Sequence, residues 1–219
     1  MRIVALLLLC SWLCQAARAQ STPPITRHYK AGLRFNFVGL ADPIDNNISV
    51  GGEFPFHPSW SVTADLAYIE HSSYFSNTRR TGGYMVKPAI RFYPASFHHS
   101  GFFEAVLFYK RVNYHQRDWL GMDCVDGVPT YEQYKNFVYR KEVMGFNLQM
   151  GFQTALSSNK RFGLEGWLGL GLRVRHQDVA GEENACYNAT WRSFDINGHS
   201  GTVVLSSFPA GLRLVYSIR

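Results

Sequence analysis

Eight stretches of the chain alternate between apolar and polar side chains with a period of two residues. Clusters of turn-forming residues separate them, and no helical pattern longer than two turns stands out after residue 19. Such alternation is typical of β-strands with one apolar face. The stretches lie at residues 29–37, 48–56, 60–68, 84–92, 103–110, 144–153, 162–175 and 204–218. The pattern predicts an all-β protein of eight strands.

Alternation alone does not separate a soluble barrel, apolar inside, from a membrane barrel, apolar outside. An aromatic residue lies near one end of the apolar face in every stretch. These residues are Tyr29, Phe56, Trp60, Phe92, Phe103, Phe152, Phe162 and Tyr216. If successive strands are antiparallel, all eight lie on one rim, like the aromatic girdle of an outer-membrane barrel. A soluble lipocalin-like barrel, the main alternative, does not explain that shared rim.

The polar face combines many glycines with a few charges of both signs. The charged residues are Arg34, Glu53, Asp65, Lys87, Arg91, Glu104, Lys110, Glu165, Arg173 and Arg213. A narrow lumen favours small residues beside paired charges, since an unpaired buried charge is costly. We expect a salt-bridged lumen that fixes strand register, with Arg91 and Glu104 in one network. A selective or gated pore is the alternative, and the excess of bases hints at anion affinity.

The connections between stretches alternate in length. Residues 57–59, 94–100 and 157–160 form short turns, whereas residues 70–82, 113–140 and 176–201 form long polar loops. Short turns on the side of the termini and long loops opposite are the outer-membrane arrangement. We therefore predict an eight-stranded antiparallel up-and-down transmembrane β-barrel with long extracellular loops and periplasmic termini. The side chains expected to face lipid include Leu66, Leu107, Leu148 and Leu170.

The composition and the first residues indicate how many domains the chain has and where it is located. The chain has 219 residues, of which 46% are hydrophobic and 17% charged, which fits one folded domain or at most two small ones. Arg2, the apolar run 4–9 and Ala17-Arg18-Ala19 indicate a secretory signal peptide over 1–19. Residues 20–28 then form a periplasmic segment and 29–219 the barrel. The formal charge of +6 includes no basic run, so nucleic acid is not an expected partner.

Two of the four cysteines, Cys124 and Cys186, lie outside the predicted signal peptide. They fall in the loops 113–140 and 176–201, which leave the membrane on the same side. An oxidising compartment favours pairing of two such thiols. We expect a Cys124–Cys186 disulfide.

Several strand motifs carry a family resemblance. Arg34-Phe35-Asn36-Phe37, the stretch Lys87 to Pro94 (KPAIRFYP) and Gly101-Phe102-Phe103-Glu104 resemble the small eight-stranded outer-membrane barrels of Gram-negative bacteria. The resemblance is to the OmpX and OmpW type and to uncharacterised porin-like barrels, and it covers residues 29–115 and 142–219. It implies a cell outer membrane location, contact with outer-membrane lipid and insertion by the barrel-assembly machinery. It says almost nothing about activity.

Candidate site residues are sparse. Tyr131, Tyr134, Phe137 and Tyr139 form either a loop recognition surface or, as we favour, a hairpin extension whose aromatics pack on each other. His57, His98 and His99 lie in turns without acidic or cysteine partners at ligand spacing, so we expect no metal site. His71 with Ser73 is the weak basis for a lipid-modifying enzyme. No catalytic residue or cofactor is expected.

These observations leave three function classes. The leading one is a non-enzymatic outer-membrane barrel whose surface loops act in envelope integrity, adhesion or capture of an extracellular ligand. The second is a small pore or transport-associated component. The third is a lipid-modifying enzyme of the outer membrane.

Overall fold

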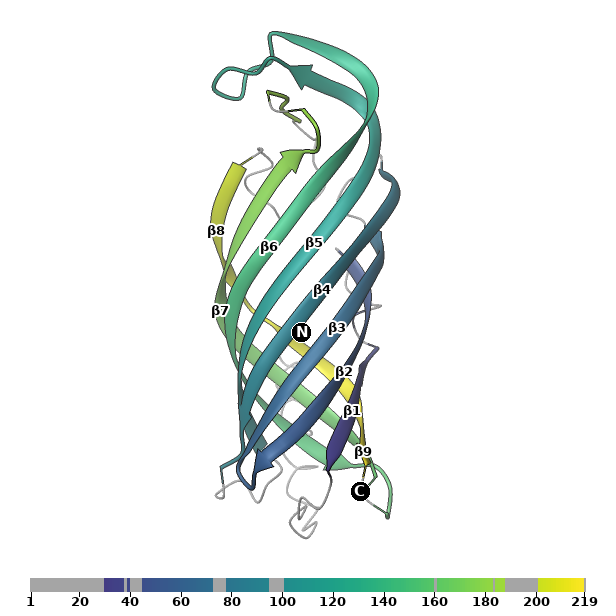
Figure 1. Cartoon of the computed structure of the whole chain (residues 1–219), viewed down its shortest axis with the longest axis vertical. Coiled ribbons are helices and arrows are strands. Elements are labelled where there is room, and N and C mark those ends of the chain that lie inside the picture. Colours follow the sequence, from purple (N-terminus) through teal and green to yellow (C-terminus); the bar gives the residue numbers. More distant parts are fainter. Residues whose placement is uncertain are drawn as a thin grey trace, which may run out of the picture.

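The computed structural model describes residues 30–37, 39, 45–72, 78–94, 101–159, 161–182, 184–187 and 201–218. Its nine strands form one antiparallel sheet, which closes into a ring because β6 also pairs with β7 (Figure 1). The strands are β1 (Ala31–Asn36), β2 (Asp45–His57), β3 (Trp60–Ser72), β4 (Thr78–Phe92), β5 (Gly101–Met122), β6 (Tyr131–Ala155), β7 (Phe162–Val179), β8 (Gly201–Ser207) and β9 (Ala210–Ile218). The predicted all-β fold is confirmed.

In the described part of the chain, no helix is long and apolar enough to cross a membrane. The predicted signal peptide lies outside the described residues.

The last predicted strand is divided in two. β8 pairs with residues 171–177 of β7, and β9 pairs with residues 162–168 of the same strand. Phe208 and Pro209 separate them. Proline has no N–H to donate to a sheet ladder, which accounts for the break. The structure therefore has nine strands where the alternation predicts eight.

The outer face of the ring is apolar over a broad belt. Leu66, Leu107, Leu148 and Leu170 all point outward and are 59–64% exposed. The strands tilt steeply around the ring (Figure 1). Within the described strands, no charged side chain points outward between the two aromatic rims that bound this belt.

The lower rim is the aromatic rim that the sequence predicts. Its rings pack in tilted neighbouring pairs, with centroids 4.8 Å apart for Trp60 and Phe92 and 5.0 Å apart for Phe162 and Tyr216. Phe103 is directly opposite Phe92 in the β4–β5 register. Seven of the eight predicted residues thus lie on adjacent strands at one level, while Tyr29 lies outside the described residues.

The upper rim consists of Tyr68, Tyr84 and Tyr109. Tyr68 and Tyr84 are cross-strand partners, and the centroids of Tyr84 and Tyr109 are 6.1 Å apart. Charged residues return to the outer face immediately above this rim, in the pairs Arg111–Glu142 at 3.6 Å and Arg140–Asp178 at 3.7 Å. The belt is therefore bounded above by tyrosines and ion pairs.

The prediction of a polar loop over 113–140 is wrong for most of its length. β5 and β6 continue as a paired hairpin from Asn113↔Arg140 to Met122↔Tyr131, and the hairpin rises above the other strands and bends over them (Figure 1). One face of this extension is buried in a hydrophobic cluster. The neighbouring connections are also shorter than predicted, because β3 runs to Ser72 and β7 to Val179.

Candidate functional site

Arg91 occupies the centre of the ring's inner face in its lower half. It is fully buried, and its guanidinium lies 3.3 Å from Glu53, 3.3 Å from Glu104 and 2.7 Å from Glu165. The group also stacks on the Phe102 ring, 3.8 Å from its centroid. A planar, permanently charged fork is suited to bridging several carboxylates. Arg91 therefore ties together strands β2, β4, β5 and β7.

Two further arginines complete this cluster. Arg213 contacts Glu165 at 2.5 Å, Glu104 at 3.2 Å and Asp65 at 3.3 Å. Arg34 contacts Glu104 at 3.3 Å and Asp65 at 3.5 Å. We call the set the inner ion network; its members are Arg34, Glu53, Asp65, Arg91, Glu104, Glu165 and Arg213. All seven are buried.

Hydroxyl donors satisfy the remaining lone pairs of two carboxylates. Ser61 and Tyr93 each donate to Glu53 Oε1 at 2.6 Å, and Thr63 donates to Glu104 Oε1 at 2.7 Å. Buried charges are tolerated only when paired and hydrogen-bonded. These donors lie on β3 and just after β4, at inward positions that sequence analysis did not single out.

The structure brings together seven of the ten predicted lumen charges, including the pair Arg91 and Glu104, which are directly opposite each other in register. Three predicted members lie elsewhere. Lys87 is opposite Asp65 in register but forms no ion pair with a described residue. Lys110 belongs to a second cluster, and Arg173 is exposed on the inner face without an ion-pair partner in the described ranges. Alternation gives the inward direction of a side chain but not its height in the ring.

The second cluster surrounds Asp45, at the start of β2, and sequence analysis missed it. Asp45 binds Lys110 and Lys141, the latter at 3.1 Å, and accepts hydrogen bonds from Ser72 at 2.6 Å and Tyr114 at 3.1 Å. Asp45 falls before the second alternating stretch, and Lys141 falls between the predicted loop 113–140 and the stretch 144–153, so neither was considered for the lumen. Continuing the alternation of the second stretch back to Asp45 would have predicted that the Asp45 side chain points inward.

The Asp45 cluster lies above the upper tyrosine rim. Burial alone would raise the pKa of Asp45, but the ammonium groups of Lys141 and Lys110 lower it below its ordinary value. Burial lowers the pKa of Lys141 to about 8, and Asp45 opposes that shift. The carboxylate is thus ionised near neutral pH and holds both lysines at the top of the ring's interior.

A cluster of apolar and aromatic side chains closes the upper end. We call it the cap cluster; it comprises Ile69, Val112, Tyr114, Leu120, Phe137, Tyr139, Val179 and Tyr187. Tyr187 packs edge-on against Phe137 with centroids 4.9 Å apart, and it donates a hydrogen bond to Asp118 at 2.8 Å. Burial, followed by that bond, raises the pKa of Tyr187 well above its ordinary value. The segment after β7 is therefore packed beneath the β5–β6 hairpin.

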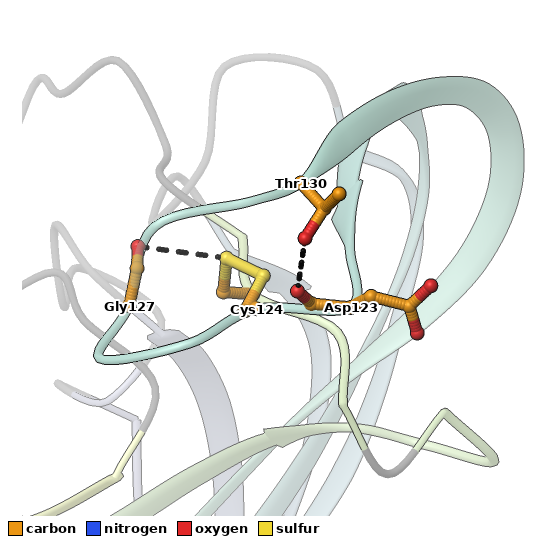
Figure 2. The surroundings of a disulfide bond; sticks show 5 residues. Asp123, Cys124, Gly127 and Thr130 are labelled. Atoms are coloured by element: carbon orange, nitrogen blue, oxygen red, sulfur yellow. Dashed lines mark hydrogen bonds between the residues drawn. A yellow bond between two sulfur atoms is a disulfide. The ribbon is translucent and has the colours of Figure 1, made fainter.

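A disulfide links the same two segments. Cys124 and Cys186 are bonded, with Cα atoms 6.0 Å apart across 62 residues of sequence, which confirms the predicted bridge. Gly121 forms an isolated β-bridge with Cys186. Figure 2 shows the loop around the bridge, where Thr130 donates to the Asp123 carbonyl at 2.8 Å. The hairpin tip and the segment after β7 are thus covalently and non-covalently joined.

The hairpin tip is built by a tight turn. Asp126 and Gly127 both have positive φ, and Val125 and Val128 exchange two backbone hydrogen bonds of 3.0 Å around them. This is a two-residue type I′ turn, in which Asp-Gly is strongly preferred. The Asp-Gly pair between two valines is the sequence signal that sequence analysis overlooked in the predicted loop.

The four aromatic residues proposed as a recognition surface do not lie on one face. Phe137 and Tyr139 are buried in the cap cluster, whereas Tyr131 and Tyr134 are both 51% exposed. Tyr134 instead faces Trp119, with ring centroids 5.5 Å apart. The favoured alternative, a hairpin whose aromatics pack on each other, describes Tyr134, whereas the rings of Phe137 and Tyr139 pack against Tyr187 of the segment after β7.

The histidines give no sign of a metal site within the described residues, which contain no cluster of three or more metal-ligating side chains. His57 accepts a hydrogen bond from the Ser59 amide at 3.2 Å. His98 and His99 lie outside the described residues, as does Ser73, the predicted neighbour of His71. His71 is exposed at the upper end of β3.

The fold and its interior define an all-β protein whose closed antiparallel sheet surrounds buried ion pairs and carries a disulfide-braced hairpin. Residues 4–218 match the model of DUF3575, a family of proteins of unknown function, and the chain belongs to this family. No curated protein matches the sequence.

Proposed function

We propose that the chain is a non-enzymatic outer-membrane β-barrel, related to the OmpX and OmpW type, that displays the β5–β6 hairpin at the cell surface for adhesion or ligand capture. In this proposal β8 and β9 are two halves of the eighth barrel strand. The observation that carries it is the outer belt, where no described charged side chain lies between the two aromatic rims. A water-facing surface of this breadth would carry charges.

The height of the belt supports membrane insertion. On β6 the outward apolar positions extend from Met144 to Phe152, nine residues. A tilted strand needs about 9–11 residues to cross the hydrocarbon core. Outer-membrane lipid is thus the proposed partner of the belt, and the barrel-assembly machinery the proposed route of insertion.

The inner ion network argues for a closed barrel rather than an open pore. Arg91, Glu53 and Glu165 are each fully buried, so they fill the cross-section at their level. Eight strands enclose a lumen that side chains can fill. A small pore remains the second candidate, and a lipid-modifying activity near His71 the third.

The upper hairpin offers a surface for binding. Trp119 is 58% exposed beside Tyr134, and the Arg117 guanidinium lies 5.4 Å from the centroid of the Tyr134 ring. Aromatic residues and arginine dominate binding surfaces. The disulfide holds this surface in one conformation, which lowers the entropic cost of binding.

Conductance in planar bilayers tests the closed barrel. The folded chain should insert without forming a stable open channel, while removal of the network charges in Arg91→Ala with Arg213→Ala should increase conductance. A steady channel in the unmodified chain would favour the pore. Lipid A mass spectrometry on an overexpressing strain tests the enzyme alternative, which a modified lipid would support.

A further inference from the structure

The pairing of β3 with β4 stops below the upper ends of both strands. The last pair is Ile69↔Gly83, although β3 continues to Ser72 and β4 begins at Thr78. Among the described residues above that pair, β3 pairs only with β2, and β4 only with β5. The wall of the ring therefore opens between these two strands.

A β-bulge lies on each side of the opening. In the β2–β3 ladder the register shifts around Glu70, which has no partner on β2, and in the β4–β5 ladder it shifts around Arg79, which has no partner on β5. An inserted residue bends its strand and redirects nearby side chains, and bulges are frequent beside functional sites. Both inserted residues here are charged and exposed.

A cavity of about 290 Å³ lies in the opening. Arg79, Arg80 and His71 line it together with Glu70, and its lining extends down to Tyr68 of the upper tyrosine rim. We call it the rim cavity. It lies where the apolar belt ends and charged side chains return to the outer face.

The outer face around the rim cavity carries more arginines than carboxylates. Two of these arginines, Arg111 and Arg117, have partners on β6, a carboxylate and an aromatic ring respectively. Arg79 and Arg80 form neither an ion pair nor a hydrogen bond with any described residue. Glu70 is the one carboxylate that lines the cavity among the described residues, and within them it is also unpaired. Two guanidinium groups thus share the cavity with one carboxylate.

We propose that the rim cavity binds a phosphate group in the headgroup of an outer-leaflet lipid, with Arg79 and Arg80 as its principal donors. Guanidinium groups bind phosphate through paired N–H groups. The inference rests on the proposed membrane insertion, because interfacial tyrosines lie at the headgroup level of a bilayer. Leu66, 64% exposed on the same strand below Tyr68, would contact the acyl chains of the same lipid. This continuity with the belt favours a lipid over a free anion.

The test is native mass spectrometry of the full mature chain, folded in dodecyl maltoside and titrated with diphosphoryl lipid A or with the same lipid after removal of its phosphates. We expect saturable binding of the phosphorylated lipid that weakens at high salt. Arg79→Gln with Arg80→Gln should lower the affinity about tenfold or more, because two charge-assisted contacts are lost. The matched control is Lys30→Gln with Arg161→Gln, which removes two exposed bases at the lower end and should leave the affinity unchanged.

A variant of opposite sign separates binding from a structural role. Glu70→Gln should raise the affinity for the phosphorylated lipid, because it removes the carboxylate that repels the phosphate. Equal binding of the two lipids, or equal losses in the two double variants, would overturn the proposal. Displacement of the lipid by an equimolar amount of inorganic phosphate would show a site for the free anion and would overturn the lipid assignment.

Flotation with phosphatidylcholine vesicles distinguishes this inference from the proposed function. The unmodified chain and all variants should float with the vesicles. Failure of the unmodified chain to float would refute the membrane barrel, and the lipid site with it. Flotation without phosphate-dependent binding would overturn the lipid site alone.

Discussion

At the residue scale, single arginines connect strands that are far apart in the sequence. Arg91 contacts carboxylates from β2, β5 and β7, and Arg213 contacts carboxylates from β3, β5 and β7. Backbone pairing links only neighbouring strands, whereas these contacts cross the interior. Each arginine therefore couples the register of several strands at once.

The first prediction concerns the pair Arg91 and Glu104. Arg91→Gln or Glu104→Gln alone leaves a buried charge without its partner, which we expect to cost about 3–5 kcal/mol. The double substitution should cost less than the sum of the singles, as measured by urea unfolding in detergent micelles. The partly exposed pair Arg111 and Glu142, on the outer face, is the control, with an expected coupling of about 0–1 kcal/mol. Strict additivity for the buried pair would refute the network.

At the element scale, the β5–β6 hairpin is the part of the molecule that extends furthest beyond the belt. Its outer face carries Trp119 and Tyr134, and its inner face packs Leu120 and Phe137 into the cap cluster. The disulfide and the packing of Tyr187 join it to the segment after β7. The hairpin thus has two different faces, one for stability and one accessible from outside.

The second prediction concerns this disulfide. Reduction, or Cys124→Ser with Cys186→Ser, should accelerate tryptic cleavage at Arg117 and Lys135, because the tip loses its covalent link to the segment after β7. The chain-entropy model limits the loss of stability to about 4 kcal/mol for a loop of this length, and the packed cap reduces it. The double serine variant should be insensitive to reductant. Identical cleavage of oxidised and reduced chains would show that packing alone fixes the tip.

The third prediction compares two neighbouring positions of β6. Leu148 points outward and Gln149 inward, opposite Glu104 in register. Leu148→Arg should cost about 2–4 kcal/mol in micelles or bilayers, because it places a charge in hydrocarbon. Gln149→Arg should cost less, since Glu104 is within reach of a new base. Equal costs would show that the outer face is not in contact with lipid.

At the scale of the whole molecule, the interior is divided into three levels. The inner ion network lies lowest, the Asp45 cluster lies above it, and the cap cluster lies at the top. The outer face has a matching division into a lower aromatic rim, an apolar belt, and tyrosines beneath ion pairs. Both faces thus distinguish one end of the ring from the other.

The fourth prediction concerns that orientation. An epitope inserted between Asp126 and Gly127, at the hairpin tip, should bind antibody on intact cells. The same epitope inserted between Ser158 and Asn159, in the turn between β6 and β7, should bind only after the cells are permeabilised. Both sites are turns, so both insertions should be tolerated. Antibody binding at the second site on intact cells would reverse the proposed topology.

The sequence by itself determined the all-β class, the direction in which each belt side chain points, the lower aromatic rim and the pairing of Cys124 with Cys186. These features follow from residue types and from their local alternation, because successive side chains of a strand point to opposite faces. The match of Arg91 with Glu104 also followed, because a short turn fixes the register of the two strands that it joins.

Only the tertiary structure decided the rest. The height of each charge in the ring depends on the stagger between strands that are distant in sequence, so alternation could not separate Lys110 and Arg173 from the inner ion network or find Asp45 and Lys141. The β5–β6 extension was predicted as a loop because its outer face is polar above the belt, and its buried face is defined by contacts with Ile69, Val179 and Tyr187. The break between β8 and β9 likewise depends on where Pro209 falls against β7. In each case the deciding contact joins residues that the chain brings together only when the sheet closes.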